Sequence, residues 1–504
     1  MIINGETEVE LSVNYSELLA KLEIDYLLVN STNEYLVEYP NLEENARYTL
    51  TGFSGSTGDA LITRDGIYLF VDGRYHTQAD LEAKEGVTVV KLQLGQRQDD
   101  EIRKLIDANN VLGIISKKVS QKRLEEFAGY KVKLLDVDPI NNFTSPHSQP
   151  MQAVEPIKYT PDRAMLITNL EEASYLTGLR DFSKDCSSKA FIKLFIEGDV
   201  RKILDKNYES FLTSYKEPLA VDKSSINAYD YALIQHPVEQ NSPIKFLKSV
   251  KTEAEIESYK SAFERTDKAV MAIRQYIEDN ENLTEYDIAT KLREEFIHYG
   301  AKSLSFKSIV AVNQNSALAH YSKNSKDVVL TEGSLVLIDC GAYYEEGLAT
   351  DITRVFVKGK PSDLQKTVYT TVLKAFLNAF HYPCNEGTTG FELDKLAHTI
   401  LDDKLDGFTF GHGLGHGIGI NVHEAPPALN QSEIAHTELQ NNMCFTIEPG
   451  LYNPHYFGVR LENSCYMKNS KICSFVKMGY EGKLIDYKML SEQEQEWLKE
   501  FEIL

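Results

Sequence analysis

The chain has 504 residues, of which 42% are hydrophobic and 25% are charged. This length and composition are typical of a soluble globular protein with about two to four domains. The formal net charge of -22 disfavours nucleic acids and anionic membranes as partners, because both would repel the protein at long range.

The first residues and the cysteines indicate a cytoplasmic location. The segment Met1–Glu6 lacks the basic start and apolar core of a signal peptide, and no apolar run is long enough to cross a membrane. The cysteines show no paired spacing, so we expect reduced thiols rather than a disulfide framework.

Two stretches of the N-terminal half predict α/β structure. Residues 51–58 form the glycine-rich run TGFSGSTG. Further along, residues 69–75 form a predicted strand that ends in DGRY. Residues 164–168 and 190–196 are strand-like, with a helical segment around residues 173–180 between them. Taken alone, the glycine-rich run fits any tight turn before a strand.

Turn-forming residues indicate two boundaries. Residues 141–150 are rich in Asn, Ser and Pro and predict a first linker, and a second break is expected between Pro237 and Pro243. We therefore expect three domains, at residues 1–145, 146–243 and 244–504.

Three helix starts are predicted after the second boundary. The spacing of a capping box occurs at residues 252–255, 284–287 and 389–392. The first box opens a long helix that reaches about residue 277. Its apolar side is predicted to contain Ile256, Tyr259, Phe263, Val270 and Ile273.

Two aspartates lie at the ends of predicted strands. Asp339 ends an apolar run and would share a strand face with Leu335 and Leu337. Asp351 opens a second strand, residues 352–357, behind a stretch with hairpin character. A buried carboxylate requires a shifted pKa, a basic partner or a cation. The two carboxylates are expected to meet across one antiparallel pair.

Two glutamates follow the same pattern. Glu448 ends the alternating strand 443–448, where Pro-Gly turns the chain. Glu462 ends a second alternating segment and is expected to share a face with Arg460.

A run of glycines and histidines separates these strand pairs, at residues 410–424. Its glycines allow the backbone to approach a ligand closely, and His412, His416 and His423 can bind metal or peptide. One imidazole with four carboxylates suits Mn, Co, Fe or Zn. A pair of such ions can clamp a hydrolytic transition state, so we predict a two-metal hydrolase site.

Each residue alone also has a simpler interpretation. Asp339 or Asp351 could be a turn-flanking or ion-paired aspartate, and Glu462 a partner of Arg460 or Arg354. The glycine-histidine run could be a flexible loop. The coincidence of five suitable residues at strand ends and in one glycine loop favours the metal site.

At these residues the chain resembles a known family. The blocks IDCGAYY, TDITRVF, FGHGLGHGIGINVHEAPP, FTIEPGLY and GVRLEN are similar to those of the pita-bread metallopeptidases, specifically the Xaa-Pro aminopeptidases. The resemblance covers residues 245–504. Residues 51–75 resemble a creatinase-type N-terminal domain, and residues 164–196 resemble more loosely the second domain of three-domain members. The implied fold class is α+β, with a pita-bread catalytic domain after two α/β creatinase N-terminal-type domains.

The resemblance implies a set of metal ligands. Asp339 would bind one ion, Asp351 and Glu462 would bridge both ions, and His416 with Glu448 would complete the shell of the other. In the family the glutamate that matches Glu448 also handles the proton of the attacking water. The cofactor implied is two divalent ions, with Mn preferred and Co, Zn or Fe as alternatives.

The resemblance also implies residues that contact the substrate. His320, within the block NSALAHY at residues 315–321, together with His412 and His423, is similar to family histidines that position the substrate and stabilise the intermediate. Arg460 completes the implied catalytic set. A lone histidine is more often a structural residue, and the motif agreement reverses this for His320 and His423 more firmly than for His412.

One feature departs from the family pattern. Eleven residues lie between Asp339 and Asp351, one more than is usual. A shift of one residue within a strand would turn a side chain to the wrong face. We expect the turn at residues 344–348 to absorb the additional residue, and we retain both aspartates as ligands.

The sequence thus predicts a cytoplasmic two-metal aminopeptidase that removes the first residue from peptides with proline in second position. The proline preference follows from the resemblance alone, as does the expectation of a homodimer. The alternatives are a prolidase, which cleaves Xaa-Pro dipeptides, a metal-free creatinase-like hydrolase and a metal-free binding module on the same fold. The apparent second N-terminal domain favours the aminopeptidase over the prolidase.

Overall fold

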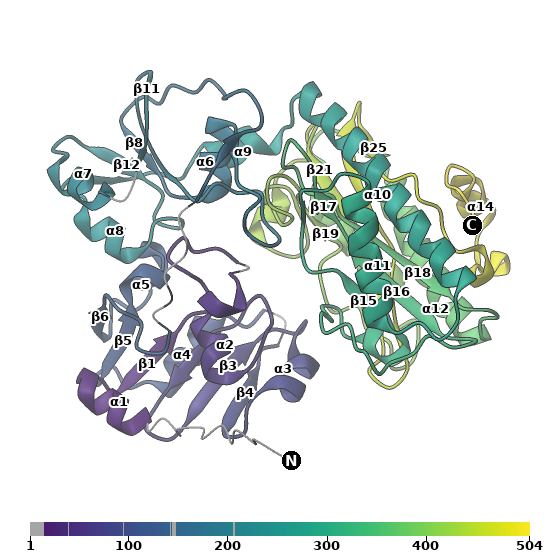
Figure 1. The fold of residues 1–504 in the computed structure, drawn as a ribbon, viewed down its shortest axis with the longest axis horizontal. Helices are drawn as coiled ribbons and strands as arrows, with labels where there is room; N and C mark the ends of the chain where they lie inside the picture. The colour runs from purple at the N-terminus through teal and green to yellow at the C-terminus, as the bar shows by residue number, and fades with distance from the viewer. Residues whose placement is uncertain (1–14, 39, 94, 142, 144–147, 205–206) are drawn as a thin grey trace, which may run out of the picture. The chain divides into compact units, whose positions relative to one another are not determined.

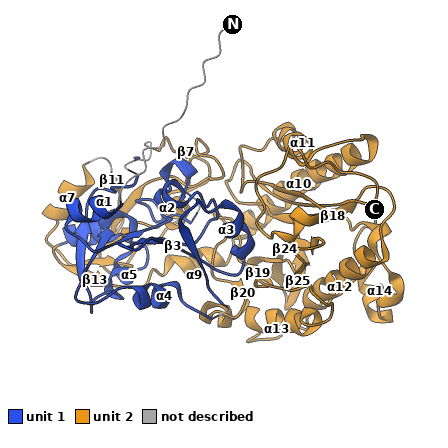
Figure 2. Ribbon diagram, turned by 90° about the horizontal axis from the view of Figure 1, so that it is seen from below, with its two compact units in different colours: residues 1–145, 223–234 blue, residues 146–222, 235–504 orange. Residues whose placement is uncertain are grey.

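The computed structural model describes residues 15–38, 40–93, 95–141, 143, 148–204 and 207–504 (Figure 1). The chain forms two compact units, coloured separately in Figure 2. Unit 1 comprises residues 1–145 and 223–234, and unit 2 comprises residues 146–222 and 235–504. The segment Met1–Glu6 lies outside the described residues, as do positions 142 and 144–147 of the predicted first linker.

Unit 1 is built on a six-stranded mixed sheet in the order β4-β3-β2-β1-β5-β6. The pairs β1–β5, β5–β6 and β3–β4 are parallel, whereas β2 is antiparallel to β1 and to β3. The strands are β1 (Tyr26–Val29), β2 (Ala60–Ile62), β3 (Ile67–Val71), β4 (Val87–Lys91), β5 (Val111–Ile115) and β6 (Lys131–Leu135). The helices are α1 (Tyr15–Leu22), η1 (Leu42–Glu44), α2 (Ala46–Thr51), α3 (His76–Glu82), α4 (Gln98–Leu105), η2 (Ser116–Lys118), α5 (Gln121–Glu125) and α8 (Ala228–Leu233).

Helices cover both faces of this sheet because successive strand residues point to opposite sides. Leu28 packs in a cluster with Ile102 of α4, whereas the adjacent Leu27 packs in a different cluster with Leu50 of α2.

The glycine-rich run forms a turn that a buried arginine holds in place. Arg47 donates hydrogen bonds to the carbonyl oxygens of Gly55 at 2.5 Å and Thr57 at 3.2 Å.

The first part of unit 2 contains a five-stranded sheet in the order β11-β10-β8-β12-β13. Its strands are β8 (Met165–Ile167), β10 (Lys193–Glu197), β11 (Val200–Leu204), β12 (Leu219–Val221) and β13 (Pro237–Glu239). The pair β7 (Met151–Gln152) and β9 (Leu179–Arg180) and the helices α6 (Leu170–Thr177) and α7 (Tyr208–Ser214) complete it. The strand-helix-strand pattern predicted over residues 164–196 is present. Pro237 starts an edge strand, where a missing N–H is tolerated.

The rest of unit 2 is organised around a six-stranded antiparallel sheet. Its order is β15-β16-β18-β24-β21, and β25 pairs with β24. The strands are β15 (Ile309–Val312), β16 (Leu335–Cys340), β18 (Ile352–Val357), β21 (Cys444–Ile447), β24 (Glu462–Lys468) and β25 (Lys471–Ser474). Short pairs join β14 (Ser303–Leu304) to β17 (Ala342–Tyr343), β19 (Gly415–His416) to β20 (Ala428–Leu429) and β22 (Gly450–Tyr452) to β23 (Gly458–Arg460).

The predicted capping boxes begin three of the helices in this part. Thr252, Thr284 and Thr389 each cap a helix whose third residue returns a carboxylate to the cap. All five apolar residues predicted for the first helix are buried. The helices are α9 (Ile244–Ser249), α10 (Glu253–Asp279), α11 (Glu285–His298), α12 (Asp363–Phe380), α13 (Gly390–Leu401) and α14 (Glu492–Leu498). The 3-10 turns are η3 (Asn313–Ala317), η4 (Glu433–His436), η5 (Gly482–Leu484) and η6 (Tyr487–Met489).

The sheet lies between two helix layers. Val336 and Ile338 of β16 pack in one core with α10 and α11, which lie across the sheet in Figure 1. Leu335 and Leu337 pack in a second core with α12 and α13. Asp339 continues the second series, as its position in the strand predicts.

One hydrophobic core joins the two parts of unit 2. The cluster that contains α10 also contains Ile167, Leu194 and Ala220 of the five-stranded sheet. One face of the five-stranded sheet therefore shares its core with the C-terminal part. The six cysteines are free thiols, as expected: Cys186, Cys340, Cys384, Cys444, Cys465 and Cys473.

Candidate metal centre

Three antiparallel strands bring three carboxylates to one face of the sheet. Asp339 on β16 lies directly opposite Thr353 on β18, and Thr353 lies opposite Glu462 on β24. Asp351 is two residues before Thr353, and alternate residues of a strand share a face. The additional residue between the aspartates does not disturb this relation, because residues 344–347 form a turn closed by a hydrogen bond of 3.0 Å between Gly347 N–H and the Tyr344 carbonyl.

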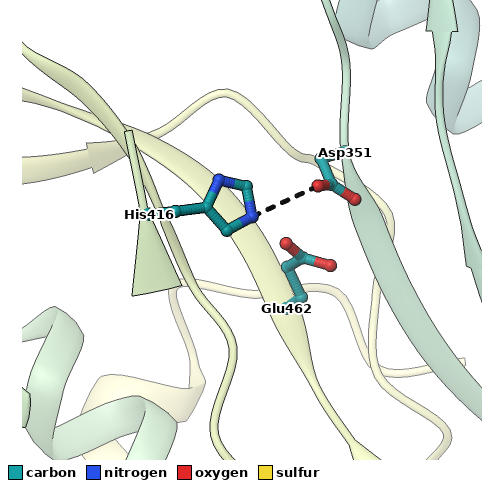
Figure 3. A group of neighbouring side chains, drawn as sticks. All are labelled: Asp351, His416 and Glu462. Carbon is teal, nitrogen blue, oxygen red and sulfur yellow. Dashed lines mark ion pairs between the residues drawn. The ribbon is translucent and has the colours of Figure 1, made fainter. Parts of the chain in front are cut away.

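An imidazole completes a compact group with two of these carboxylates. One ligand atom each of Asp351, His416 and Glu462 lies within 4.8 Å of the others (Figure 3). The Nε2 atom of His416 is 3.6 Å from Oδ2 of Asp351 and 3.4 Å from Oε1 of Glu448. The Nδ1 atom of His416 lies 3.1 Å from the carbonyl oxygen of Gly417. A carbonyl only accepts, so Nδ1 carries a proton and the neutral ring presents Nε2 to a metal.

Three carboxylate oxygens in this site fit a bound cation. Oδ1 of Asp339, Oδ1 of Asp351 and Oε1 of Glu462 are buried and have no hydrogen-bond partner among the described residues. Buried polar atoms are normally satisfied, and an exception requires an explanation. Oxygen atoms with one imidazole nitrogen are a donor set for Mn or similar divalent ions. The residues present therefore fit the metal pair that the sequence predicts.

The electrostatics of the site agree with this fit. Burial and the nearby carboxylates of Glu462, Asp339 and Glu448 raise the pKa of Asp351 well above its ordinary value. Burial, with Glu448 and Asp339, does the same to the pKa of Glu462. Ionised carboxylates so close together in a buried place repel one another, and a divalent cation between them removes that cost.

Glu448 occupies the strand end predicted for it, directly after β21. Its Oε2 lies 3.8 Å from Nε of Arg460, and its Oε1 accepts a hydrogen bond of 3.4 Å from the Thr446 hydroxyl. Burial and Asp339 raise the pKa of Glu448 to about 7, although Arg460 acts in the opposite direction. Glu448 is thus near His416, while the compact three-residue group does not include it.

A chain of hydrogen bonds extends from Asp339 to His412. Arg460 donates from Nη2 to Oδ2 of Asp339 at 2.5 Å and from Nη1 to the hydroxyl of Tyr452 at 2.8 Å. The Tyr452 hydroxyl is 2.8 Å from Nε2 of His412, whose Nδ1 is 2.8 Å from the Gly413 carbonyl. Because that carbonyl only accepts, Nδ1 of His412 is the donor and the neutral ring accepts from Tyr452. Arg460 therefore pairs with Asp339 and not with Glu462.

Two residues of this site were not predicted from the sequence. Tyr452 links Arg460 to His412, and the Thr353 hydroxyl donates to Oε2 of Glu462 at 2.7 Å. Thr353 also accepts from Nε of Arg460 at 3.2 Å. The strand register gives a signal for Thr353, since it lies between Asp339 and Glu462 across the sheet.

His423 lies beside the group of Asp351, His416 and Glu462, with its ring centroid 4.3 Å from that of His416 in an edge-to-face arrangement. His320 follows η3 in a turn. The buried carboxylate of Glu285 holds that turn, because it accepts hydrogen bonds from the Tyr321 hydroxyl at 2.6 Å and the Ser325 N–H at 2.9 Å. Ser316 of η3 also binds Gly458 of the strand that ends at Arg460.

Two glycines of the glycine-histidine run lie close to other backbone segments. A side chain at Gly415 would lie 2.0 Å from the Thr446 carbonyl, and one at Gly417 would lie 2.1 Å from the Glu424 carbonyl. These glycines let the loop backbone approach other backbone segments, which places His416 against β21.

Comparison with known proteins agrees with this geometry. Residues 257–469 match the model of metallopeptidase family M24, and residues 14–142 match the creatinase/prolidase N-terminal domain. Residues 257–469 belong to metallopeptidase family M24. The M24 match contains all five proposed ligands, and the C-terminal part of the chain has the pita-bread fold.

Relatives of this chain match almost its full length. A probable Xaa-Pro aminopeptidase P of Coprinopsis cinerea is 26% identical over 96% of the chain and 92% of the relative. Xaa-Pro aminopeptidase 1 of Dictyostelium discoideum is 27% identical over 94% of the chain and 88% of the relative. The crystal structure of X-prolyl aminopeptidase from Caenorhabditis elegans, described as a cytosolic enzyme with a di-nuclear active site, superposes with a TM-score of 0.83 at 21% identity over 95% of this chain and 90% of that one.

Within the described part of the chain, no helix combines the length and apolar character needed to span a membrane.

Proposed function

We propose that this chain is a metal-dependent aminopeptidase that releases the N-terminal residue from peptides with proline in second position. The observation that carries the proposal is the set of three buried, unpartnered carboxylate oxygens of Asp339, Asp351 and Glu462 beside His416. The membership in family M24 supports peptide hydrolysis, and the names of the near full-length relatives support the proline preference.

Five residues are proposed to hold two divalent ions, which we take to be Mn. Asp339 would hold one ion, Asp351 and Glu462 would be shared by both ions, and His416 and Glu448 would hold the other. When bound, the ions would supply Lewis acids for the scissile carbonyl and lower the pKa of water. Asp339 presents Oδ1 to the site, because Arg460 occupies its Oδ2.

The remaining residues are proposed to act on the substrate and on protons. Glu448 accepts the proton of the attacking water and delivers it to the leaving amine. His423 and His320 donate hydrogen bonds to the charge that develops on the scissile carbonyl oxygen and to the substrate backbone. Tyr452 links His412 to Arg460. This chain of hydrogen bonds orients Asp339 and holds the side chain of His412 at the substrate site.

The proposal also covers the location, assembly, partners and domain organisation of the protein. We infer a cytoplasmic homodimer that binds neither nucleic acid nor membranes, in agreement with the net charge of -22. We also infer three domains, at residues 1–145, 146–243 and 244–504, of which the second and third share a core.

A metal-reconstituted peptide assay tests the activity. The metal-stripped protein is loaded with Mn and given three matched substrates: an Xaa-Pro-Yaa peptide, an Xaa-Pro dipeptide and an Xaa-Ala-Yaa peptide. We expect cleavage of the first bond of the Xaa-Pro-Yaa peptide, weaker cleavage of the dipeptide and none of the alanine peptide. Preference for the dipeptide would identify a prolidase. Absence of stoichiometric metal together with absence of hydrolysis would identify a binding module.

A further inference from the structure

We propose that Lys189, from the segment between β9 and β10, is a positioning residue for His423. The Nζ atom of Lys189 donates to Oδ1 of Asn421 at 2.7 Å, and Nδ2 of Asn421 donates to the carbonyl oxygen of His423 at 2.8 Å. The inference rests on the proposed function, because it requires His423 to contact the substrate.

The chemistry of the lysine sets the orientation of the asparagine. An ammonium group has three donors and no acceptor, so it binds only the oxygen of the Asn421 amide. The amide nitrogen is then directed to the His423 carbonyl, and the opposite orientation would place two donors against each other. Lys189 thereby determines which group of Asn421 holds the His423 backbone.

The other end of this short loop is fixed in the same way. Oε1 of Glu424 lies 2.6 Å from Nζ of Lys248 and 3.5 Å from Nζ of Lys251. Oε2 of Glu424 accepts from the Asn421 N–H at 3.1 Å. Buried lysines therefore hold the chain on both sides of His423. Lys189 acts through Asn421, whose side chain contacts the His423 backbone, and Lys248 and Lys251 act through Glu424.

The hydrogen bond between Lys189 and Asn421 is buried, so water cannot replace it when the lysine is removed. Lys189 and Asn421 are each only 7% exposed. The neighbouring Ser188 is fully buried and donates to the Gly347 carbonyl at 2.7 Å, with a second carbonyl, that of Ile420, at 3.3 Å. The segment 188–189 thus holds both the turn between the metal aspartates and the loop before His423. An apolar side chain at position 189 would leave the Asn421 oxygen without this donor.

The segment between β9 and β10 belongs to the predicted second domain, whereas His423 belongs to the catalytic one. The proposal therefore gives residues 146–222 a part in the reaction: they hold a histidine in place without touching the substrate. A displacement of about 1 Å of a catalytic group can lower the rate about 100-fold.

The test uses the full-length, Mn-loaded enzyme and the Xaa-Pro-Yaa peptide. Lys189→Met removes the donor, and Asn421→Asp keeps an acceptor for Lys189 but cannot donate to His423. Lys184→Met is the matched control, because Lys184 is an equally buried lysine of the same region that packs over the Phe191 ring at 4.5 Å. We expect kcat to fall between about 10-fold and about 100-fold in the first two variants, with KM and metal content retained, and to stay within about twofold in the control.

A double-mutant cycle separates positioning from a general structural effect. In a His423→Ala background, Lys189→Met should lower kcat by no more than about a further twofold, because the residue that it positions is absent. Equal losses in the presence and absence of His423 would overturn the proposal. So would a loss in the Lys184→Met control as large as that in Lys189→Met.

A second measurement does not depend on activity. In protein labelled with 15N-histidine, the His423 ring signals are identified by their absence in His423→Gln. They should shift in Lys189→Met and not in Lys184→Met, and unchanged signals would overturn the proposal. The expected shift in Lys189→Met, together with a wild-type enzyme that cleaves no peptide, would contradict the proposed function and leave the Lys189 contact standing.

Discussion

Arg460 and Asp339 form a buried ion pair in which Nη2 and Oδ2 are 2.5 Å apart. The pair fixes the carboxylate so that its second oxygen, Oδ1, remains without a hydrogen-bond partner among the described residues. Burial alone would lower the pKa of Arg460, but Tyr452, Asp339 and Glu448 together raise it well above its ordinary value. Arg460 is therefore a permanent positive charge that orients Asp339, one of the proposed metal ligands.

Replacement of Arg460 should destabilise the site even before metal is added. Arg460→Met leaves the Asp339 carboxylate buried without its charged partner, and removal of one member of a buried pair commonly costs about 3 to 5 kcal/mol. Urea unfolding of the metal-free protein measures the change. Arg460→Lys is the control, because it keeps the charge and should lose less. An unchanged free energy of unfolding in Arg460→Met would contradict the role assigned to this pair.

Metal binding should stabilise the fold through the same oxygens. A ligand at 100 times its dissociation constant stabilises the native state by about 2.7 kcal/mol, so Mn should raise the melting temperature of the metal-free protein. Glu462→Gln should remove most of this increase and most of the turnover. Glu481→Gln, which changes a buried glutamate that caps η5 and lies 3.4 Å from Arg274, should keep both. If Glu462→Gln retained two ions with normal kinetics, Glu462 would not be a ligand.

Removal of His423 should affect the reaction and leave the metals in place. His423→Ala deletes a hydrogen-bond donor to developing charge, and such losses commonly lower turnover about 100- to 1,000-fold. Metal content and melting temperature should stay near those of the wild type, because the side chain of His423 is only half-buried. Measurement of all three on one preparation decides the matter. A destabilised variant with wild-type turnover per folded molecule would place His423 outside the site.

A carboxyl group away from the metals should give the fold a measurable pH dependence. Burial raises the pKa of Glu172, on α6, to about 7, and among the described residues only one of its oxygens has a hydrogen-bond partner, Ser242 Oγ at 2.5 Å. Between the unfolded pKa, about 4.5, and the folded pKa, the unfolded chain has lost this proton while the native state keeps it. Stability should therefore fall as pH rises from about 4.5 to about 7 and then level off, by about 2 to 4 kcal/mol for this group.

Glu172→Gln tests this directly. The amide keeps an acceptor for Ser242 and has no proton to lose, so the variant should gain stability over the wild type at pH 8 and not at pH 4.5. Urea unfolding at both values measures the difference. The same gain at both pH values would show that titration of Glu172 does not contribute.

Local sequence signals predicted the strands and helix starts that carry the site. The alternation of Leu335, Leu337 and Asp339 gave the correct face of β16, and the capping-box threonines gave the starts of α10, α11 and α13. These signals are local because they depend on side-chain period and on hydrogen bonds within one turn.

Contacts between distant segments could not be predicted in this way. Tyr452 lies in a short strand after a Pro-Gly turn, and nothing near it in sequence indicates that its hydroxyl joins Arg460 to His412. Spacing alone also left the additional residue between Asp339 and Asp351 unresolved. The strand register resolves it, because Asp339 pairs with Thr353 and Asp351, two residues before Thr353, lies on the same face.

The core that joins the five-stranded sheet to α10 has a consequence for proteolysis. A protease that cuts the chain between Pro237 and Pro243 would break one peptide bond, but Ile167 and Leu194 would still pack in one apolar cluster with Ile256 and Phe263. The two fragments should therefore stay together through gel filtration and separate only when urea unfolds them. A nicked enzyme of this kind should keep its metals and continue to cleave peptides.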